Sequence, residues 1–199
     1  MKKTLNIHSK TIAYQGFFKI ELVDYQHSLY QGGMSPKIRR ELFNRGQAVV
    51  VLLYDLTKQC VVLIEQCRAG ALEQAIISQH DHQAWLIEPV AGMIDEGETA
   101  QQACEREVLE EAGIALKDFE YISQFYPSPG GSSEILHLYA AQLDSDQLAE
   151  FSGLEHEVED IRIIKLAFSQ AKQRLLNGEF NVASTIIGLQ WLFFQRLIS

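Results

Sequence analysis

Glutamates are concentrated between residues 96 and 111, in a pattern that suggests metal chemistry; they are Glu96, Glu98, Glu105, Glu107, Glu110 and Glu111. If this segment is helical, Glu107, Glu110 and Glu111 share one face, because residues three and four apart are neighbours on a helix. Like charges at that spacing destabilise a helix, and Arg106 is the only cation in the segment. A divalent cation would neutralise them, and ligation by oxygen alone indicates Mg²⁺ or Mn²⁺.

The opposite arc of the same segment is small and apolar, and consists of Ala100, Cys104, Val108 and Ala112. Such an arc can pack on a sheet while the carboxylates face a cleft. The alternative is a charged face exposed to solvent, which is the usual fate of a glutamate-rich helix. We favour the metal site because the acids adjoin the apolar arc and follow a glycine loop at residues 92–97.

The ends of this helix carry their own signals. Thr99 and Gln102 form a T-x-x-Q capping box, and Gly113 stands where a helix would stop. Two further helices are expected later in the chain. One is capped by Ser169 and ends at Asn177 and Gly178, and the other covers residues 182–197.

Apolar and alternating runs predict strands at residues 12–14, 17–25, 38–44, 48–54, 60–65, 85–90, 119–126, 135–141 and 161–166. The fold class is therefore α+β, with a mixed sheet and roughly three helices around it. The first 45 residues are β-rich and too few to bury a core easily alone. We therefore predict an N-terminal β-rich piece at 1–45 and a main domain at 46–199.

Composition excludes several classes of function. The chain has 199 residues, 47% of them hydrophobic, and a formal net charge of −9. That charge, without a basic stripe, argues against a nucleic-acid partner. No apolar run approaches the ~20 residues that span a bilayer, and no signal-peptide core follows the N-terminal lysines. Cys60, Cys67 and Cys104 are expected to be free thiols, so we expect a cytoplasmic protein with no membrane partner.

Read from Gly92, the glycine loop and the helix follow a known pattern. Glu98 comes after five intervening residues, and seven residues later the chain reads Arg-Glu-Val-Leu-Glu-Glu-Ala-Gly-Ile at 106–114. This resembles the Nudix box, G-x5-E-x7-R-E-U-x-E-E-x-G-U with U apolar, at every constrained position. Such a match would arise by chance roughly once in 10⁹ placements. The chain is thus identified as a member of the Nudix hydrolase superfamily, which implies an α/β/α sandwich that binds Mg²⁺ at diphosphate substrates.

Other segments resemble the bacterial ADP-ribose pyrophosphatases within that superfamily. They lie at residues 14–18 (YQGFF), 39–46 (RRELFNRG), 62–68 (VLIEQCR), 90–97 (VAGMIDEG), 128–134 (SPGGSSE), 157–162 (EVEDIR) and 181–192 (NVASTIIGLQWL). Pro129 lies fifteen residues past Ile114, where this subgroup carries a proline. The resemblance implies Mg²⁺-dependent hydrolysis of ADP-ribose to AMP and ribose 5-phosphate.

The resemblance also implies residue roles at the metal. Glu107, Glu111 and the backbone carbonyl of Ala91 would bind Mg²⁺, with Mn²⁺ a possible substitute, and Glu159 would add a ligand when substrate is bound. Glu157 would be the general base that activates the attacking water. Acids alternate at 155, 157 and 159, so the base could lie two residues from this position.

On the substrate side, Arg68 resembles the arginine that binds the diphosphate. Positions that line the ribose and phosphate part of the pocket are matched by Met93, Ser128, Pro129, Gly130 and Glu134. Positions on the adenine side and from the second subunit are matched by Phe17, Phe18, Arg40, Glu41 and Arg45. The resemblance therefore implies a homodimer with exchanged N-terminal pieces, although aromatic residues such as Phe17 could equally fill a small core.

Two alternatives to ADP-ribose hydrolysis stay open. A sister enzyme that cleaves GDP-mannose or another nucleotide sugar shares the same layout of strand, SPGG loop and acid. A non-catalytic module that senses ADP-ribose would have the same fold. Such modules usually lose metal-binding glutamates, and Glu107, Glu110 and Glu111 are all present.

Overall fold

The computed structural model describes residues 2–154 and 158–197. It divides into two compact units. The first contains Met1–Gln47 with Tyr126–Ile135, and the second contains Ala48–Phe125 with Leu136–Ser199. The segment Tyr126–Ile135 is thus grouped with the N-terminal strands. The assignment of 1–45 and 46–199 to separate domains stays a prediction.

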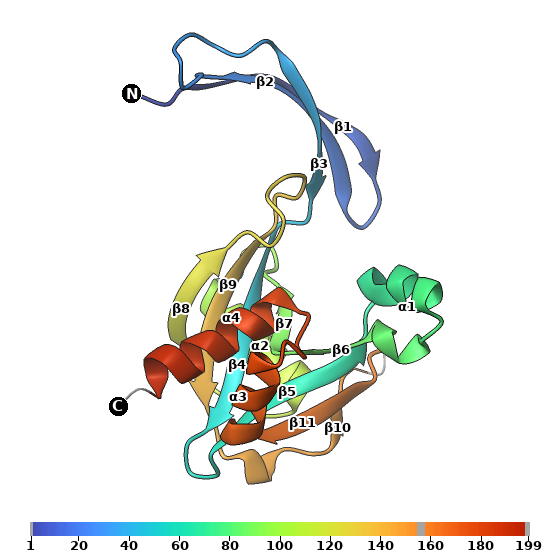
Figure 1. The fold of residues 1–199 in the computed structure, drawn as a ribbon, viewed down its shortest axis with the longest axis vertical. Coiled ribbons are helices and arrows are strands. Elements are labelled where there is room, and N and C mark those ends of the chain that lie inside the picture. Colours follow the sequence, from blue (N-terminus) through green and yellow to red (C-terminus); the bar gives the residue numbers. More distant parts are fainter. Residues whose placement is uncertain (1, 155–157, 198–199) are drawn as a thin grey trace. The chain divides into compact units, whose positions relative to one another are not determined.

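The first unit is a three-stranded antiparallel sheet in the order β1-β2-β3 (Figure 1). Its strands are β1 (Leu5–Gln15), β2 (Lys19–His27) and β3 (Ile38–Asn44). The third strand was predicted with these bounds. The first is longer than expected, and Phe17 and Phe18 lie in the turn before β2 and not in the strand. Backbone hydrogen bonds from Phe43 N to Gly131 O and from Ser133 N to Phe43 O join the 126–135 segment to β3.

Charged groups, and not apolar ones, are buried in this sheet. In the described part of β1–β3 no hydrophobic side chain is buried, but Glu21 and Asp24 of β2 are. Asp24 accepts from Arg39 at 2.7 Å, and Glu21 lies 2.8 Å from the amine of Lys10. These partners lie on the two strands that flank β2, so ion pairs link all three strands.

The second unit contains an eight-stranded mixed sheet in the order β10-β11-β5-β4-β9-β8, with β6 paired to β5 and β7 to β4. Its strands are β4 (Gln47–Asp55), β5 (Cys60–Cys67), β6 (Trp85–Glu88), β7 (Val90–Met93), β8 (Glu120–Phe125), β9 (Ile135–Gln142), β10 (Phe151–Ser152) and β11 (Ile161–Ala167). Its helices are α1 (Leu72–Ser78), α2 (Ala100–Ala112), α3 (Phe168–Leu176) and α4 (Ala183–Trp191), the last continuing as a π-helical turn (Leu192–Arg196). Its described residues also form short 3-10 turns at Ala69–Ala71, Asp81–Ala84 and Ser145–Gln147.

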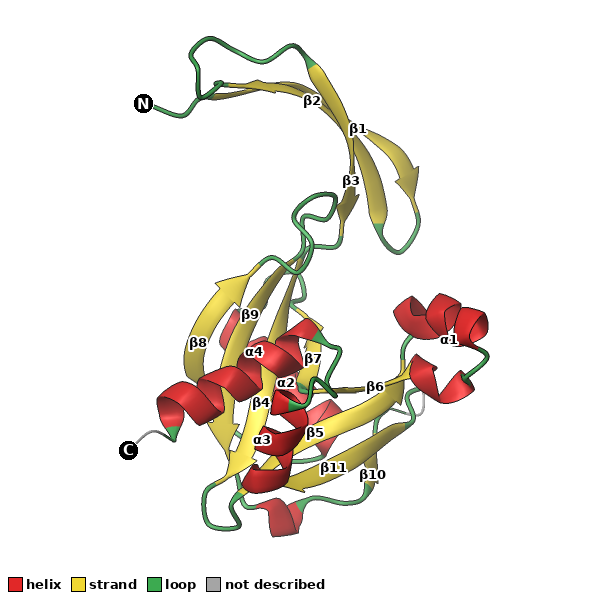
Figure 2. Cartoon of the chain, in the orientation of Figure 1, coloured by secondary structure: helices red, strands yellow, loops and turns green. Residues whose placement is uncertain are grey.

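Helices cover both faces of this sheet because β4 and β5 are apolar on both sides. Val49, Val51 and Leu53 of β4 pack with the α2 residues Cys104 and Val108 in one core. Their neighbours along β4, Leu52 and Tyr54, pack with α3 and α4 in a second core. A strand that alternates between two buried faces reads as a continuous apolar run, which explains the sequence of β4. Figure 2 shows the resulting layers, and the predicted α/β/α arrangement of an α+β fold is confirmed.

Two local expectations were wrong. The strand expected at 85–90 is two strands separated by Pro89, because proline has no N–H to donate to a ladder. The side chain of Ser169 does not cap α3, whose N-cap is Ala167. The three cysteines are free thiols as expected, with Cys60 and Cys104 buried and Cys67 exposed. Among the described residues, no helix is both long and apolar enough to cross a membrane.

Candidate active site

The helix α2 begins and ends where the sequence signals predicted. Thr99 accepts a hydrogen bond from the backbone N–H of Gln102, and the Gln102 side chain accepts one from the backbone of Thr99. Gly113 closes the helix with φ +70°, a left-handed conformation that favours glycine. The apolar arc is buried as expected, and the helix axis is therefore fixed against the sheet. That packing determines which glutamates face inward.

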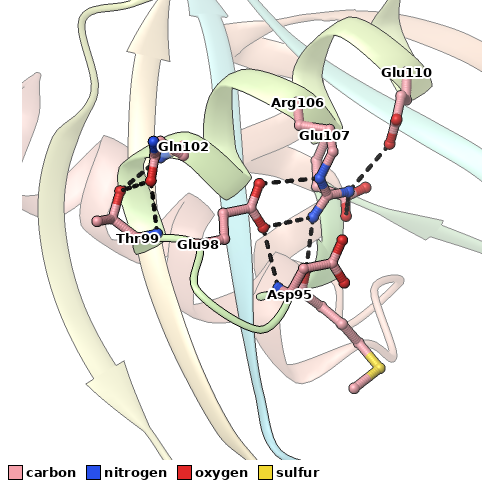
Figure 3. A network of polar contacts seen from close by, with 8 residues as sticks. Asp95, Glu98, Thr99, Gln102, Arg106, Glu107 and Glu110 are labelled. Carbon is pink, nitrogen blue, oxygen red and sulfur yellow. Dashed lines mark hydrogen bonds and ion pairs between the residues drawn. The ribbon is translucent and has the colours of Figure 1, made fainter.

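A single guanidinium organises the acids of the box (Figure 3). Arg106 donates from Nε and Nη2 to Glu98, at 3.1 and 2.9 Å. Its Nη1 donates to Glu107 at 2.5 Å and to Glu110 at 3.1 Å. Nη2 also donates to the backbone oxygen of Met93 at 2.8 Å, which ties the helix to the end of β7. The one cation of the segment is thus shared among three carboxylates.

The carboxylate of Glu107 lies where only a glycine at position 92 leaves room for it. A Cβ atom placed on Gly92 would lie 1.8 Å from Glu107 Oε1. Glu107 is 8% exposed, and burial raises the pKa of its carboxyl although Arg106 lowers it. Burial outweighs the lowering effect of the ion pair with Arg106, and the negative charge of Glu110 adds to the rise.

Glu111 is deeply buried and forms no ion pair with another described residue. It is 2% exposed. Its Oε2 accepts from the backbone N–H of Ala91 at 2.8 Å, and its Oε1 accepts from Nε2 of Gln66 at 3.2 Å. Burial raises the pKa of Glu111 to about 8, against the lowering effects of Ala91 N–H and of the charge on Arg68. Neutral donors orient this carboxylate but do not neutralise it.

Arg68 follows β5 directly, and its positive charge lowers the pKa of Glu111, against the larger raising effect of burial. Its Nε donates to Oε1 of Glu88 at 2.5 Å. The side chain of Glu88 is 10% exposed and that of Arg68 is 37% exposed. Burial raises the pKa of Glu88, while Arg68 lowers it.

The acids fit a divalent cation of the Mg²⁺ type. Among the described residues, no three side chains of His, Cys, Asp or Glu lie close enough together to form a metal site alone. Mg²⁺ retains several waters and needs few protein ligands, so two carboxylates and a carbonyl suffice. Glu107 and Glu111 supply two desolvated carboxylates, and both contact the β7 segment of Ala91 and Gly92. The carbonyl of Ala91 as a ligand stays a prediction.

The acidic loop after β10 is described only in part. Burial is the main cause that raises the pKa of Glu107, and the negative charge of Glu159 adds to this effect. Glu159 Oε2 accepts from the N–H of Leu154 at 3.4 Å. The predicted base Glu157, and Glu155 beside it, lie outside the described residues.

Several predicted substrate residues form one cluster within the first unit. The guanidinium carbon of Arg45 lies 4.7 Å from the ring centre of Phe18, and its Nη1 lies 3.3 Å from Glu134. Phe17 packs edge-on against Phe18 with ring centres 4.7 Å apart, and remains 87% exposed. These residues come from the β1–β2 turn, the end of β3 and the 126–135 segment. A planar cation among aromatic rings is a rigid arrangement that leaves the outermost ring free.

The other predicted substrate residues are not drawn into that cluster by any hydrogen bond or ring contact among the described residues. Arg40 and Glu41 are exposed on β3, and Ser128, Pro129 and Gly130 are exposed in the loop that follows β8. Met93 belongs to the second unit and accepts from Arg106 through its backbone oxygen.

Sequence reasoning missed Gln66 and Glu88, which contact Glu111 and Arg68. Both are buried polar residues near the end of an apolar strand, and that was the available signal.

Comparisons with known proteins bear on the family of this chain. The NUDIX domain model matches residues 44–182. The ADP-ribose pyrophosphatase of Escherichia coli strain K12 is 38% identical over 191 residues, covering 96% of this chain and 88% of that protein. That of Haemophilus influenzae is 36% identical over 191 residues, covering 96% and 87%. The GDP-mannose pyrophosphatase of Klebsiella pneumoniae is 33% identical over 199 residues, covering 98% and 96%.

The fold is also found among solved structures. A crystal structure of an ADP compounds hydrolase superposes with a TM-score of 0.67, over 96% of this chain and 95% of that one, at 20% identity. At that identity the likeness concerns the fold alone. The match to the family model and the identity to its members decide the classification: the chain belongs to the Nudix hydrolase family.

Proposed function

We propose that this Nudix hydrolase cleaves the diphosphate of ADP-ribose with Mg²⁺, giving AMP and ribose 5-phosphate, and that Mn²⁺ can substitute. The observation that carries the proposal is the 38% identity to ADP-ribose pyrophosphatases over 96% of the chain. That extent of similarity includes segments outside the box, and in this proposal those segments determine which substrate binds. The buried, desolvated carboxylates of Glu107 and Glu111 support the metal requirement.

In the proposed reaction, water attacks one phosphorus atom, and the bond from that phosphorus to the bridging oxygen breaks. Bound Mg²⁺ supplies charge neutralisation of the diphosphate and lowers the pKa of a bound water. Glu107, Glu111 and the Ala91 carbonyl would hold it, with Glu159 joining once substrate is bound. Arg106 fixes Glu107, and Gln66 with the Ala91 N–H fixes Glu111.

The remaining steps concern the proton and the leaving charge. Glu157 would accept the proton of the attacking water, which leaves a phosphate group on each product. Arg68 would donate hydrogen bonds to the diphosphate from its terminal nitrogens. A guanidinium suits this task because its planar donors match phosphate oxygens in pairs.

The nucleotide end of the substrate would be recognised by the first unit. Phe17 offers an exposed ring for stacking on adenine, and Arg45, Phe18 and Glu134 hold the turn that presents it. Arg40, Glu41, Met93 and Ser128–Gly130 complete the proposed set. We also propose a homodimer in which the N-terminal pieces are exchanged. Sedimentation velocity tests the dimer, and a monomer at micromolar concentration would contradict it.

A panel of nucleotide sugars tests the substrate. The purified protein is assayed with Mg²⁺ against ADP-ribose, ADP-glucose, GDP-mannose and UDP-glucose, and kcat/KM is compared. We expect ADP-ribose to lead by at least about tenfold, which corresponds to about 1.4 kcal/mol of differential transition-state binding. A wide preference for another member of the panel overturns the proposal.

GDP-mannose is the second candidate substrate, because the Klebsiella pneumoniae relative named for it is 33% identical over 98% of this chain. A lead for GDP-mannose in the same panel would select it. Tight binding of ADP-ribose with Mg²⁺ but no turnover would instead indicate a sensing module.

A further inference from the structure

Arg68 is anchored at one edge and free at the other. Its Nε donates to Glu88, and among the described residues no hydrogen-bond partner is found for Nη1 or Nη2. The contrast with Arg106 is complete, since Nε, Nη1 and Nη2 of Arg106 all donate to protein oxygens. Of the two guanidiniums that act on Glu107 and Glu111, only Arg68 has donors available for a ligand.

The anchor comes from a neighbouring strand. Glu88 is the last residue of β6 and pairs with Ile64 of β5, so its side chain lies on the face that carries Ile64 and Gln66. This is the face covered by α2. Where β5 ends, the apolar residues of that face give way to the polar groups of Gln66, Glu88 and Arg68. A strand places these groups more rigidly than a loop would.

An acid at this position is unfavourable for anion binding by charge alone. The side chain of Glu88 is 10% exposed, so its charge is poorly screened by solvent. Its negative charge would repel a diphosphate that approaches Arg68. The acid therefore needs a compensating role, and the single contact through Nε indicates what that role is.

We propose that Glu88 is a positioning residue, which fixes Arg68 through Nε and so directs Nη1 and Nη2 toward the diphosphate of the substrate. This role rests on the proposed function, in which Arg68 binds the diphosphate. Glu88 touches neither substrate nor metal and acts only through the guanidinium. Preorganising a long side chain lowers the entropy lost when the ligand binds.

The proposal and simple electrostatics predict opposite effects of Glu88→Leu on the binding of an anionic ligand. If Glu88 contributed only its charge, Glu88→Leu would strengthen binding of an anionic ligand. If Glu88 positions Arg68, Glu88→Leu weakens binding, while Glu88→Gln nearly restores it because the amide oxygen still accepts from Nε. The probe for binding is an ADP-ribose analogue whose bridging oxygen is replaced by CH₂, titrated calorimetrically with Mg²⁺.

For Glu88→Leu we expect Kd for the analogue and KM for ADP-ribose to rise roughly tenfold, with kcat within about threefold, because Arg68 binds ground and transition states alike. Glu88→Gln should stay within about threefold of wild type. In an Arg68→Ala background, Glu88→Leu should have no further effect, since coupled residues are not additive. Unchanged or tighter binding by Glu88→Leu, or an additive double variant, would overturn the proposal.

A second test does not depend on the folding of Glu88→Leu. In Arg68→Lys the single ammonium cannot serve Glu88 and the diphosphate together. Glu88→Gln should therefore strengthen analogue binding in the Arg68→Lys background, whereas it slightly weakens binding in the wild type. If Glu88→Gln changed the affinity for the analogue in the same direction in both backgrounds, the positioning role would be refuted.

Glu179→Leu is the matched control, because Glu179 accepts from Nε of Arg174 at 3.0 Å in the same geometry, outside the proposed site. It should leave KM and Kd unchanged. Failure of the proposed function is recognised separately. If wild-type protein does not cleave ADP-ribose, the variants are compared on the nucleotide sugar that the panel prefers, and on its CH₂ analogue.

Discussion

The buried acids of the N-terminal sheet and the two buried glutamates of helix α2 have opposite pKa shifts. In the N-terminal sheet, Arg39 holds the pKa of Asp24 well below its ordinary value, and Lys10 lowers that of Glu21. In the Nudix unit, burial raises the pKa of both Glu107 and Glu111. The first pair of acids has cations on adjacent strands. Of the second pair, one shares its cation with two other acids and one contacts none.

This difference separates structural charges from functional ones. The N-terminal sheet buries no apolar side chain in its described strands, so cross-strand ion pairs replace a core. The Nudix unit has two apolar cores, so its packing does not depend on Glu107 and Glu111. A buried carboxylate that is oriented but not neutralised costs stability, and the proposed metal would supply the missing positive charge.

The largest expected effect comes from replacing one of the two buried glutamates of helix α2. Glu111→Gln should reduce kcat by about 10³-fold or more, because it removes a metal ligand. Without divalent cations, its thermal unfolding midpoint should be unchanged or higher, since the cost of burying a carboxyl that is ionised in the unfolded chain is removed. Gln66 can turn its amide to accept from the new side chain, so the hydrogen bonds can be kept.

Glu105→Gln on the same helix is the control for that substitution, and its turnover should stay within about twofold of wild type. Differential scanning calorimetry and steady-state kinetics supply both readouts. Near-normal turnover of Glu111→Gln would remove Glu111 from the metal site.

A smaller effect is expected when Glu107 is displaced and not removed. In Gly92→Ala the new Cβ would meet the Glu107 carboxylate at 1.8 Å, and the end of that flexible side chain would move. A displacement of about 1 Å at a catalytic group can reduce turnover about 10²-fold. The free energy of unfolding should fall by about 1–3 kcal/mol at most.

Gly70→Ala has no atom within 4 Å of its new Cβ, so activity and stability should both persist. Urea denaturation and kcat measurements compare the two variants. If Gly92→Ala lost stability but kept its turnover, the close packing of Glu107 against Gly92 would be structural and not functional.

The smallest effect concerns the structural charges. Because the folded-state pKa values of Asp24 and Glu21 lie below their ordinary values of 3.8 and 4.5, their contribution is full above those values and is lost as the pH falls further. Acidification below about pH 4 should therefore loosen β1–β3. Amide hydrogen exchange, corrected for its intrinsic pH dependence, reports this strand by strand.

Asp24→Asn should show fast exchange in β1–β3 already at neutral pH, with little further change on acidification. Asp146→Asn, at an exposed pair with Lys58, is the control and should behave as wild type. Equal protection of β1–β3 in Asp24→Asn and wild type would show that the ion pairs do not hold this sheet.

Local signals allowed the box to be predicted in detail. Thr99, Gln102 and Gly113 act within one turn of the helix end, so sequence alone specifies the bounds of α2. The apolar arc of α2 was predictable because helical periodicity determines which residues share a face. The metal-binding role of Glu107 and Glu111 came from resemblance, and their burial is consistent with it.

Contacts between strands distant in sequence were not predictable in the same way. Glu88 lies opposite Ile64 only because of the β5–β6 register, and Gln66 reaches Glu111 across 45 positions of the chain. The α1 helix was missed because its exposed Leu72, Ile76 and Ile77 give no buried face for a periodicity to reveal. Signals between residues close in sequence determine where helices and strands begin and end. The register between strands determines which side chains contact one another.

At Pro89 the chain passes from β6, which pairs with β5, to β7, which pairs with β4. This change of strand partner affects how the site tolerates variation. β11 occupies the other edge of β5, so β6 and β7 fill the gap where β4 and β5 diverge. Glu88 and Ala91, which contact Arg68 and Glu111, are thus only three residues apart on one short peptide. Covalent bonds, and not the packing of separate elements, set the spacing between the arginine and the carboxylate. Mutations that shift this peptide move both groups together, so the hydrolytic geometry can persist while the surrounding sequence diverges.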